Sequence, residues 1–501
     1  MRPSRGRFRF PARRRPVHWR AWGWGAVLVA AAAALGVAAG GNPKRTALQR
    51  GIDAILTDPA LKGARIGCRV LEGDTGRVLY SFHATEPLVP ASNMKLATTA
   101  AALELLGPDY RLVTRLGLVG KDLVVIGAGD PNISGRFFGG RITAVFEAWA
   151  EQLKAREITV VEGDLVGDDT LFDRQYCHPT WPAEQLSYWY CAPVGALSLN
   201  DNCADVWVRP GEKVGRPAVV GLAPPGDHLA VVNRAVTVGG KERSGLDVRR
   251  LGSRAAVVIS GRVPLGAAPV RRYVAVHDPG MFFLESLEEV LSQRGIRVTG
   301  TCRLAEGPTD AKAFKPLAEC TSTLASAVEV ANTRSQNFYA ESLLKLVGAR
   351  AGGAPGTFAK GAAAVEAFLA RAGVGRANYV SADGSGLSRR NRLSALALTT
   401  LLRYMAGRPT GTVYRRSLAT SGVDGGLRRR MAEEPFRGRV HAKTGTLTGV
   451  SALSGYLDTL DGRTLVFSIL INSHRCSAAK ARAIQDDVCR TLVRSQPSEE
   501  R

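Results

Sequence analysis

The sequence lacks the residue patterns that metal and nucleic-acid chemistry require. It has seven His in 501 residues and no H-E-x-x-H segment, so a metallopeptidase would have no ligand set. None of its eight Cys are spaced as C-x-x-C, which disfavours zinc and thioredoxin-type sites. Zinc-finger spacing, RNP-like aromatic motifs and isolated basic helices are also missing from the body of the chain. The sequence therefore predicts no metal, no cofactor and no nucleic-acid partner.

Acidic residues are absent from the first 20 positions, which carry eight Arg. An uncharged stretch rich in Ala, Val, Leu and Gly follows from Ala21 to Gly41, and it includes the small residues Val37-Ala38-Ala39. This layout predicts that residues 1–43 are a secretory signal peptide or an N-terminal membrane anchor. Both alternatives predict an exported, periplasmic or extracytoplasmic protein, with possible membrane association through residues 21–41.

Basic residues exceed acidic ones in the rest of the chain as well. Of 67 Lys and Arg, 59 lie beyond residue 20, against 44 Asp and Glu. Such a surplus could attract anionic wall components, lipid headgroups or nucleic acid. A solvated arginine-rich surface is the preferred interpretation, because no nucleic-acid motif accompanies the charge.

The even number of Cys in an exported chain predicts disulfides. The local pairs Cys302/Cys320 and Cys476/Cys489 are preferred. For Cys68, which lies in a strand-like run, a buried free thiol is an equal alternative.

Both ends of the chain predict the same domain. The predicted helices cover Arg45–Leu56, Ser92–Leu106 and Ser477–Val493, and the predicted strands cover Ile66–Leu71, Arg77–Phe82, Gly438–Gly445, Val450–Leu457 and Thr464–Ile471. A sheet assembled from both ends, with helices packed on both faces, is an α+β fold.

The middle of the chain differs from its ends. Short β-like runs punctuated by Gly and Pro fill residues 111–320, and amphipathic helical runs return at Leu324–Val347 and Thr357–Ala372. We therefore expect one domain from residues 44–110 plus 321–495. Residues 111–320 are expected to form inserted β-rich domains, one nested in another, and residues 496–501 a disordered tail.

The segment Pro90-Ala91-Ser92-Asn93-Met94-Lys95-Leu96 contains an S-x-x-K pattern at a predicted helix start. Ser92 could simply cap the helix. Alternatively, Lys95 lies on the same helix face and could deprotonate Ser92 as a nucleophile, provided that its amine is neutral. The pattern is weak alone, since it recurs at Ser342–Lys345 and Ser477–Lys480.

Two further motifs follow in order and make the pattern specific. Ser335-Gln336-Asn337 supplies S-x-N, and Lys443-Thr444-Gly445 is the one K-T-G in the chain. Ser198-Leu199-Asn200 is a second S-x-N. The required order of the three motifs excludes the other two S-x-x-K copies, because Ser342 follows the S-x-N motif and Ser477 follows K-T-G. Ser477 is instead expected to cap the last helix. S-x-x-K, S-x-N and K-T-G in this order are the signature of penicillin-binding proteins and serine β-lactamases.

The chain resembles one branch of these proteins, the low-molecular-mass class C penicillin-binding proteins of the D-alanyl-D-alanine carboxypeptidase/endopeptidase family. That family places inserted domains between S-x-x-K and S-x-N, and here 243 positions separate Ser92 from Ser335. Further matching segments are "GDP" at 129–131, "APVGALSLNDN" at 192–202, "DGSGLSRRN" at 383–391, "GVDGGLRRRM" at 422–431 and "AKTGTLTGVSALSGYL" at 442–457.

The resemblance implies a role for each motif residue. Ser92 would attack the penultimate D-Ala carbonyl of a peptidoglycan stem peptide, with Lys95 as base, and Ser335 would relay the proton to the leaving amine in a network with Lys95 and Lys443. Asn337 would bind the substrate amide. Lys443 and Thr444 would face the terminal carboxylate beside Gly445. The N–H groups of Ser92 and Thr446 would form the oxyanion hole, and β-lactams would be inhibitors.

Several alternatives stay open at this stage. A β-lactamase or esterase could use the same fold, and a non-catalytic peptidoglycan-binding protein could retain it. The sequence does not distinguish carboxypeptidase from endopeptidase action. A structural turn is the preferred interpretation of Asp383 and Ser385, and a structural role is preferred for His441, because no G-x-S-x-G elbow is present.

Overall fold

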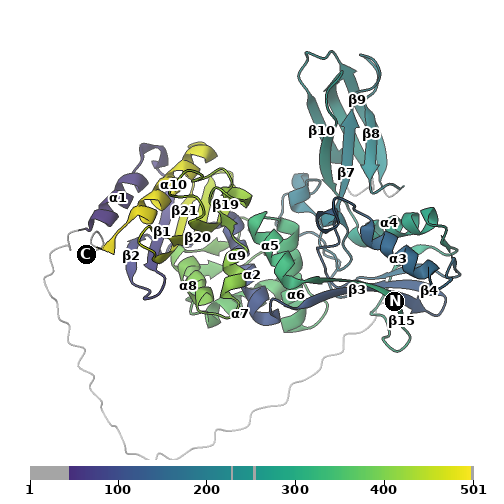
Figure 1. The fold of residues 1–501 in the computed structure, drawn as a ribbon, viewed down its shortest axis with the longest axis horizontal. Coiled ribbons are helices and arrows are strands. Elements are labelled where there is room, and N and C mark those ends of the chain that lie inside the picture. The colour runs from purple at the N-terminus through teal and green to yellow at the C-terminus, as the bar shows by residue number, and fades with distance from the viewer. Residues whose placement is uncertain (1–44, 227–228, 252–255, 498–501) are drawn as a thin grey trace, which may run out of the picture. The chain divides into compact units, whose positions relative to one another are not determined.

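A six-stranded antiparallel sheet combines strands from the two ends of the chain (Figure 1). The computed structural model describes residues 45–226, 229–251 and 256–497, and those from Thr46 onward belong to one compact unit. In spatial order the strands are β18 (Ala419–Thr420), β19 (Val440–Leu447), β20 (Val450–Asp458), β21 (Thr464–Asn472), β1 (Arg65–Glu72) and β2 (Val78–Phe82). β1 pairs with β21 from Arg65 opposite Asn472 to Glu72 opposite Leu465. The predicted sheet from both chain ends is confirmed.

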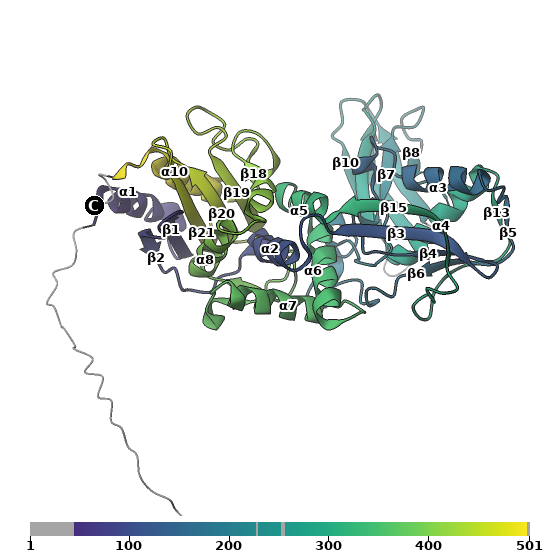
Figure 2. The same cartoon turned by 60° about the horizontal axis from the view of Figure 1, so that its bottom comes forward.

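Helices cover both faces of this sheet. On one face α1 (Ala47–Leu56) and α10 (Ala478–Arg494) lie side by side, and one apolar cluster joins Ile52, Ile469 and Val488 (Figure 1). On the other face α2 (Met94–Leu106) and α8 (Ala395–Ala406) share a second cluster with the sheet (Figure 2). Alternation along each strand sends side chains to both faces, so both are apolar. The predicted α+β class is confirmed.

The helical run predicted at Leu324–Val347 is interrupted, which corrects the expectation of one helix. α5 (Leu324–Thr333) and α6 (Asn337–Gly352) are separated by Arg334-Ser335-Gln336. Ser335 has a φ of 56°, in the left-handed region that breaks a helix of L-residues. The helix predicted from Ser92 likewise begins two residues later, at Met94. Both deviations fall at motif residues.

The segment between the motifs leaves on β3 (Arg111–Val119) and returns on β15 (Lys315–Thr323), which pair antiparallel with Arg111 opposite Thr323. These strands belong to a five-stranded sheet in the order β14-β6-β4-β3-β15. Its other strands are β4 (Asp122–Ile126), β6 (Leu165–Asp168) and β14 (Cys302–Leu304). The helices α3 (Ala144–Lys154) and α4 (Pro279–Gln293) share its apolar cluster, so this part is less purely β than the sequence predicts.

Two three-stranded sheets lie within this segment. Their orders are β12-β7-β8 and β10-β11-β9. The strands are β7 (Cys203–Arg209), β8 (Val219–Ala223), β9 (Ala230–Val238), β10 (Gly245–Arg250), β11 (Ala256–Pro264) and β12 (Val270–Ala275). Both sheets contribute to a single apolar cluster, so they pack as a unit.

The predicted disulfides are wrong, because all eight Cys are free thiols. Cys302 on β14 and Cys320 on β15 occupy opposite edge strands of the five-stranded sheet, too far apart for a bond about 2 Å long. Cys476 precedes α10, whereas Cys489 is buried on the face of α10 that packs with the sheet. Cys68 is fully buried on β1, as the free-thiol alternative held.

The predicted leader, residues 1–43, lies outside the described residues, as do 498–501 of the predicted tail. Within residues 45–226, 229–251 and 256–497, no helix is long and apolar enough to cross a bilayer.

The sheet core generates a stability prediction. Ile469→Ala removes a fully buried side chain between helices and strands, so the free energy of unfolding should fall by about 2–5 kcal/mol. Val78→Ala, at a position 47% exposed on β2, should change it by less than about 0.5 kcal/mol. Urea titration of both variants tests this, and equal losses would show that the β21 core does not carry the stability assigned to it.

Candidate active site

Ser92 lies in a single 3-10 turn, η2 (Ala91–Asn93), directly before α2. Ala91 has a φ of 46°, and no side chain forms a capping hydrogen bond at the start of η2 or of α2. The Ser92 Oγ lies 3.2 Å from the Lys95 Nζ. Ser92 is therefore not the helix cap, and its hydroxyl faces the amine one turn later.

Lys95 is fully buried and surrounded by acceptors. Besides Ser92, its Nζ donates to the Asn337 Oδ1 at 2.6 Å and to the Ser385 carbonyl oxygen at 2.8 Å. Burial lowers the pKa of the Lys95 ammonium to about 7, although the carboxyl groups of Glu341 and Asp383 act in the opposite direction. A substantial fraction of Lys95 is therefore neutral near pH 7, as a general base requires.

Asn337 is the first residue of α6, immediately after the break, and its side chain bridges two segments. Its Oδ1 accepts from Lys95, and its Nδ2 donates to the Tyr190 carbonyl oxygen at 2.8 Å. Ser335, in the break itself, lines the same cleft as Ser92. The helix interruption thus brings the S-x-N motif to the S-x-x-K motif.

Glu341, one turn further along α6, is a site residue that the sequence analysis missed. Its two carboxyl oxygens accept from the backbone N–H groups of Gly384 at 2.9 Å and Ser385 at 2.7 Å. It is fully buried, and burial followed by the nearby Asp383 raises the pKa of its carboxyl to about 8. Glu341 therefore positions the carbonyl that holds Lys95. Glu341 follows Asn337 by four residues, so the two side chains lie on the same face of α6. This spacing is the sequence feature from which a role for Glu341 at the site could have been predicted.

Asp383 organises the rest of this loop. Its carboxylate accepts from the N–H groups of Gly386 and Ser388 at 2.8 and 2.6 Å, and from the Trp181 Nε1 at 2.9 Å. It is fully buried. The hydrogen bonds of Asp383 agree with the structural turn predicted for it. Ser385, in the same turn, contacts the candidate site directly, because its carbonyl oxygen accepts from the Lys95 Nζ.

The K-T-G segment forms β19 beside the nucleophile. Lys443 is 1% exposed, its Nζ donates to the Thr444 carbonyl oxygen at 3.0 Å, and burial, with the nearby Lys95, lowers its pKa well below the usual range. The Asn93 side-chain amide connects η2 to this strand. In the orientation that satisfies both neighbours, its nitrogen donates to the Lys443 carbonyl at 2.9 Å, and its oxygen accepts from the Ser454 hydroxyl.

Gly445 allows the strand to approach the nucleophile turn. A Cβ at this position would lie 2.9 Å from the Pro90 carbonyl oxygen and 3.1 Å from the Ser92 nitrogen. These distances are shorter than ordinary van der Waals contacts, so only Gly fits.

These elements enclose a cleft of about 550 Å³. Of the predicted site residues, Ser92, Ser335, Asn337 and Thr446 line it. Lys95 and Lys443 lie buried outside the lining, and the Thr444 side chain faces Gly426. Among the bonds of the described residues, none joins Ser335 to Lys95 or Lys443.

Comparisons with known proteins identify this arrangement. The D-Ala-D-Ala carboxypeptidase 3 (S13) family matches residues 48–494, nearly the whole chain. The chain belongs to this family. Membership confirms the family predicted from the three motifs, and with it a serine-type D-Ala-D-Ala carboxypeptidase.

Individual proteins of known sequence or structure are similar to this chain. The chain is 37% identical over 487 residues to the D-alanyl-D-alanine carboxypeptidase of Actinomadura sp. strain R39, covering 93% of this chain and 88% of that one. The crystal structure of penicillin binding protein 4 (dacB) from Haemophilus influenzae has a TM-score of 0.76 at 22% identity, covering 89% and 99% of the two chains. The same protein complexed with a β-lactam has a TM-score of 0.72 at 22% identity, with 89% and 100% covered.

The other S-x-x-K copies and His441 make hydrogen bonds or ion pairs outside the candidate active site of this S13 chain. Ser342 donates to the Phe338 carbonyl oxygen within α6, and its partner Lys345 pairs with Asp173 at 2.8 Å. Ser477 caps α10 by accepting from the Lys480 N–H, as predicted. His441 contacts Thr420 and Asp458, away from the cleft.

The close approach at Gly445 predicts that Gly445→Ala displaces the turn that carries Ser92. Acylation by a fluorescent penicillin should slow by about 10–100-fold, because a displacement near 1 Å disrupts the attack geometry. Gly221→Ala on β8, where a Cβ meets nothing within 4 Å, is the matched control and should acylate like wild type. Unchanged acylation of Gly445→Ala would contradict the steric role assigned to this glycine.

Proposed function

We propose that Ser92 and Lys95 cleave the D-Ala-D-Ala bond of peptidoglycan stem peptides through an acyl-enzyme. The observation that carries the proposal is the Lys95 amine, buried with a pKa of about 7 and 3.2 Å from the Ser92 hydroxyl. Lys95 takes the Ser92 proton while Oγ bonds to the carbonyl carbon. The C–N bond then breaks, Ser335 passes a proton to the leaving amine, and water later hydrolyses the ester.

The remaining motif residues are proposed to bind the substrate. Asn337 hydrogen-bonds the substrate amide, and Lys443 and Thr444 donate hydrogen bonds to the terminal carboxylate. The N–H groups of Ser92 and Thr446 stabilise the oxyanion. The absence of a side chain at Gly445 supports this assignment, because it lets β19 reach the Ser92 nitrogen.

The domain organisation and location follow from the same proposal. Residues 44–110 and 321–495 carry the peptidase, and residues 111–320 are the inserted part, with one domain nested in another. Residues 1–43 direct export, and residues 21–41 associate the protein with the membrane if they are retained. β-Lactams act as inhibitors because they acylate the same serine.

Ser92→Ala tests the nucleophile. The full chain should form a lasting adduct with a fluorescent penicillin on the Ser92 peptide, located by mass spectrometry, and should release D-Ala from a stem pentapeptide. Ser92→Ala should retain less than about 1% of both activities. Ser342→Ala, from the S-x-x-K copy in α6, is the matched control and should retain both.

Other outcomes of that experiment assign a different function. Rapid penicillin hydrolysis without a lasting adduct would identify a β-lactamase. Folded protein with neither adduct nor hydrolysis would identify a non-catalytic wall-binding protein.

The buried amine also predicts a pH dependence. Protonated Lys95 cannot accept the Ser92 proton, so the rate constant of penicillin acylation should fall as the pH drops through about 7, by about tenfold per unit below it. Acylation measured from pH 5 to 9, with circular dichroism confirming a folded chain, tests this. A flat profile would show that Lys95 is not the base, and a rate constant that still rises tenfold per unit up to pH 9 would contradict its lowered pKa.

A further inference from the structure

A pocket of about 610 Å³ lies between β1 and α8, on the face of the six-stranded sheet that α8 covers (Figure 2). Its walls also include the turn between β1 and β2 and the residue after α7 (Phe358–Arg371). None of its lining residues lines the catalytic cleft, and β20 and β21 separate β1 from the K-T-G strand β19. A ligand can therefore occupy this pocket while a substrate occupies the cleft. The volume falls within the range of about 300–1,000 Å³ typical of ligand sites.

Arg69 of β1 lines this pocket, and the described residues give it no counter-ion. Its side chain is half-buried, and its Nη1 donates to the Thr399 hydroxyl of α8 at 3.0 Å, the one hydrogen bond of this side chain within the described part of the chain. Burial lowers the pKa of the Arg69 guanidinium. A half-buried cation with unused N–H donors is unfavourable by itself, so the pocket favours an anionic ligand.

Arg403 of α8 adds a second guanidinium to the pocket. Its Nη2 donates to the Thr75 carbonyl oxygen at 3.4 Å, which is a long and weak bond. The guanidinium lies against Gly76, where a Cβ would come within 2.6 Å of the Arg403 Cζ. Thr400 precedes Arg403 by three residues on the same face of α8 and adds a hydroxyl to the lining.

The acidic groups near the pocket do not neutralise these two arginines. Glu72, at the end of β1, accepts from the Thr75 hydroxyl and pairs with Arg77 at 3.3 Å. Asp74 is the one acidic residue among those that line the pocket, and it is exposed. The lining therefore carries two basic side chains against one acidic side chain.

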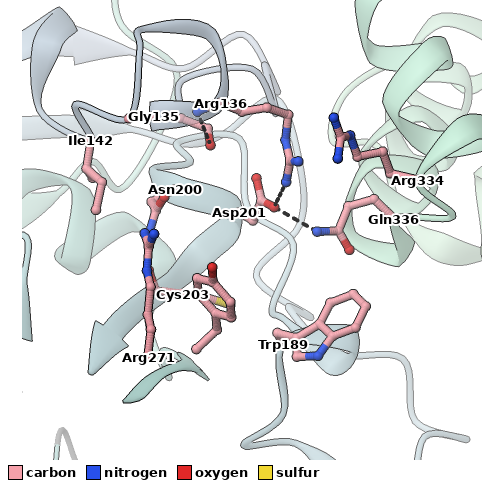
Figure 3. Close-up of a pocket in the computed structure, with 13 residues that line it drawn as sticks. Gly135, Arg136, Ile142, Trp189, Asn200, Asp201, Cys203, Arg271, Arg334 and Gln336 are labelled. Atoms are coloured by element: carbon pink, nitrogen blue, oxygen red, sulfur yellow. Dashed lines mark hydrogen bonds and ion pairs between the residues drawn. The ribbon is translucent and has the colours of Figure 1, made fainter. Parts of the chain in front are cut away.

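The pocket beside the catalytic cleft, of about 560 Å³, shows the contrast (Figure 3). Two arginines that line it have acidic partners, Arg136 with Asp201 at 2.7 Å and Arg271 with Asp205. Both arginines are more exposed than Arg69, yet both are paired. Arg69 has less access to water and no carboxylate partner, so it has the greater need of an anion.

We propose that the pocket between β1 and α8 binds an oxyanion, a phosphate or carboxylate group, between the guanidiniums of Arg69 and Arg403. The planar guanidinium matches such groups in bidentate geometry, and the Thr400 hydroxyl donates a further hydrogen bond. The pocket is larger than a single oxyanion, and Leu71 and Ala372 add apolar wall, so the group belongs to a larger molecule. This inference does not depend on the proposed D-Ala-D-Ala cleavage.

The test measures binding of two probes that carry the two kinds of oxyanion. The full chain is titrated calorimetrically with glycerol 3-phosphate and with N-acetyl-D-glutamate, at constant ionic strength with chloride as the background anion. Arg69→Gln and Arg403→Gln should each weaken binding of the preferred probe about tenfold, because each removes charge-assisted hydrogen bonds. Arg403 is exposed, so its variant keeps the test valid if Arg69→Gln does not fold.

Two further variants serve as controls of charge. Arg350→Gln should bind like wild type, because Arg350 is an exposed arginine near the end of α6 that does not line the pocket. Asp74→Asn removes the negative charge beside the pocket and should strengthen binding about twofold. Arg403→Gln should also acylate with penicillin like wild type, since Arg403 does not line the cleft.

Tighter binding of glycerol 3-phosphate would assign the pocket to phosphate esters, and tighter binding of N-acetyl-D-glutamate would assign it to carboxylates. The inference is overturned if the wild type binds neither probe, if both arginine variants bind like wild type, or if Asp74→Asn weakens binding. A failure of the proposed function has a different signature, because the wild type would then form no penicillin adduct and still bind the probe.

Discussion

The burial of the Lys95 amine is the constraint on which the site depends. An unpaired ammonium cannot be removed from water without a large loss of solvation free energy. Here three oxygens replace the water around it: one on Ser92, three residues earlier in the chain, and two on Asn337 and Ser385, which lie far away in the sequence. The same burial that lowers its pKa to about 7 therefore also fixes the positions of the three segments.

Support for these oxygens comes from residues that do not line the cleft. Glu341 holds the Ser385 turn through two backbone N–H groups, and Asp383 closes that turn on itself. Both carboxyl groups are buried, so neither is screened by solvent, and both raise the Lys95 pKa against the effect of burial. The base strength of Lys95 is thus a balance between desolvation and these two groups.

The sequence predicts the sheet, its flanking helices and the family, because strand periodicity and the order of three motifs are local signals. It does not predict the break at Arg334–Gln336, since Leu324–Val347 has helical periodicity throughout and the positive φ of Ser335 depends on tertiary contacts. Glu341 was missed for a similar reason, because its partners lie 43 and 44 residues away. Spacing also suggested a Cys302–Cys320 bond, whereas strand order separates the two thiols.

The pairing of β1 with β21 has a consequence for how the chain folds during its synthesis. β1 has left the ribosome long before β21, whose partner residues follow about 400 positions later, at Asn472 for Arg65. Until that last strand arrives, one edge of β1 stays open. β19, which carries the Lys443 carbonyl that helps to hold Asn93, also has no connection to β1 within the sheet, because it reaches β1 only through β20 and β21. The insertion can close earlier through β3 and β15. A nascent or truncated chain therefore has no assembled nucleophile, so catalytic competence arises only after synthesis is nearly complete.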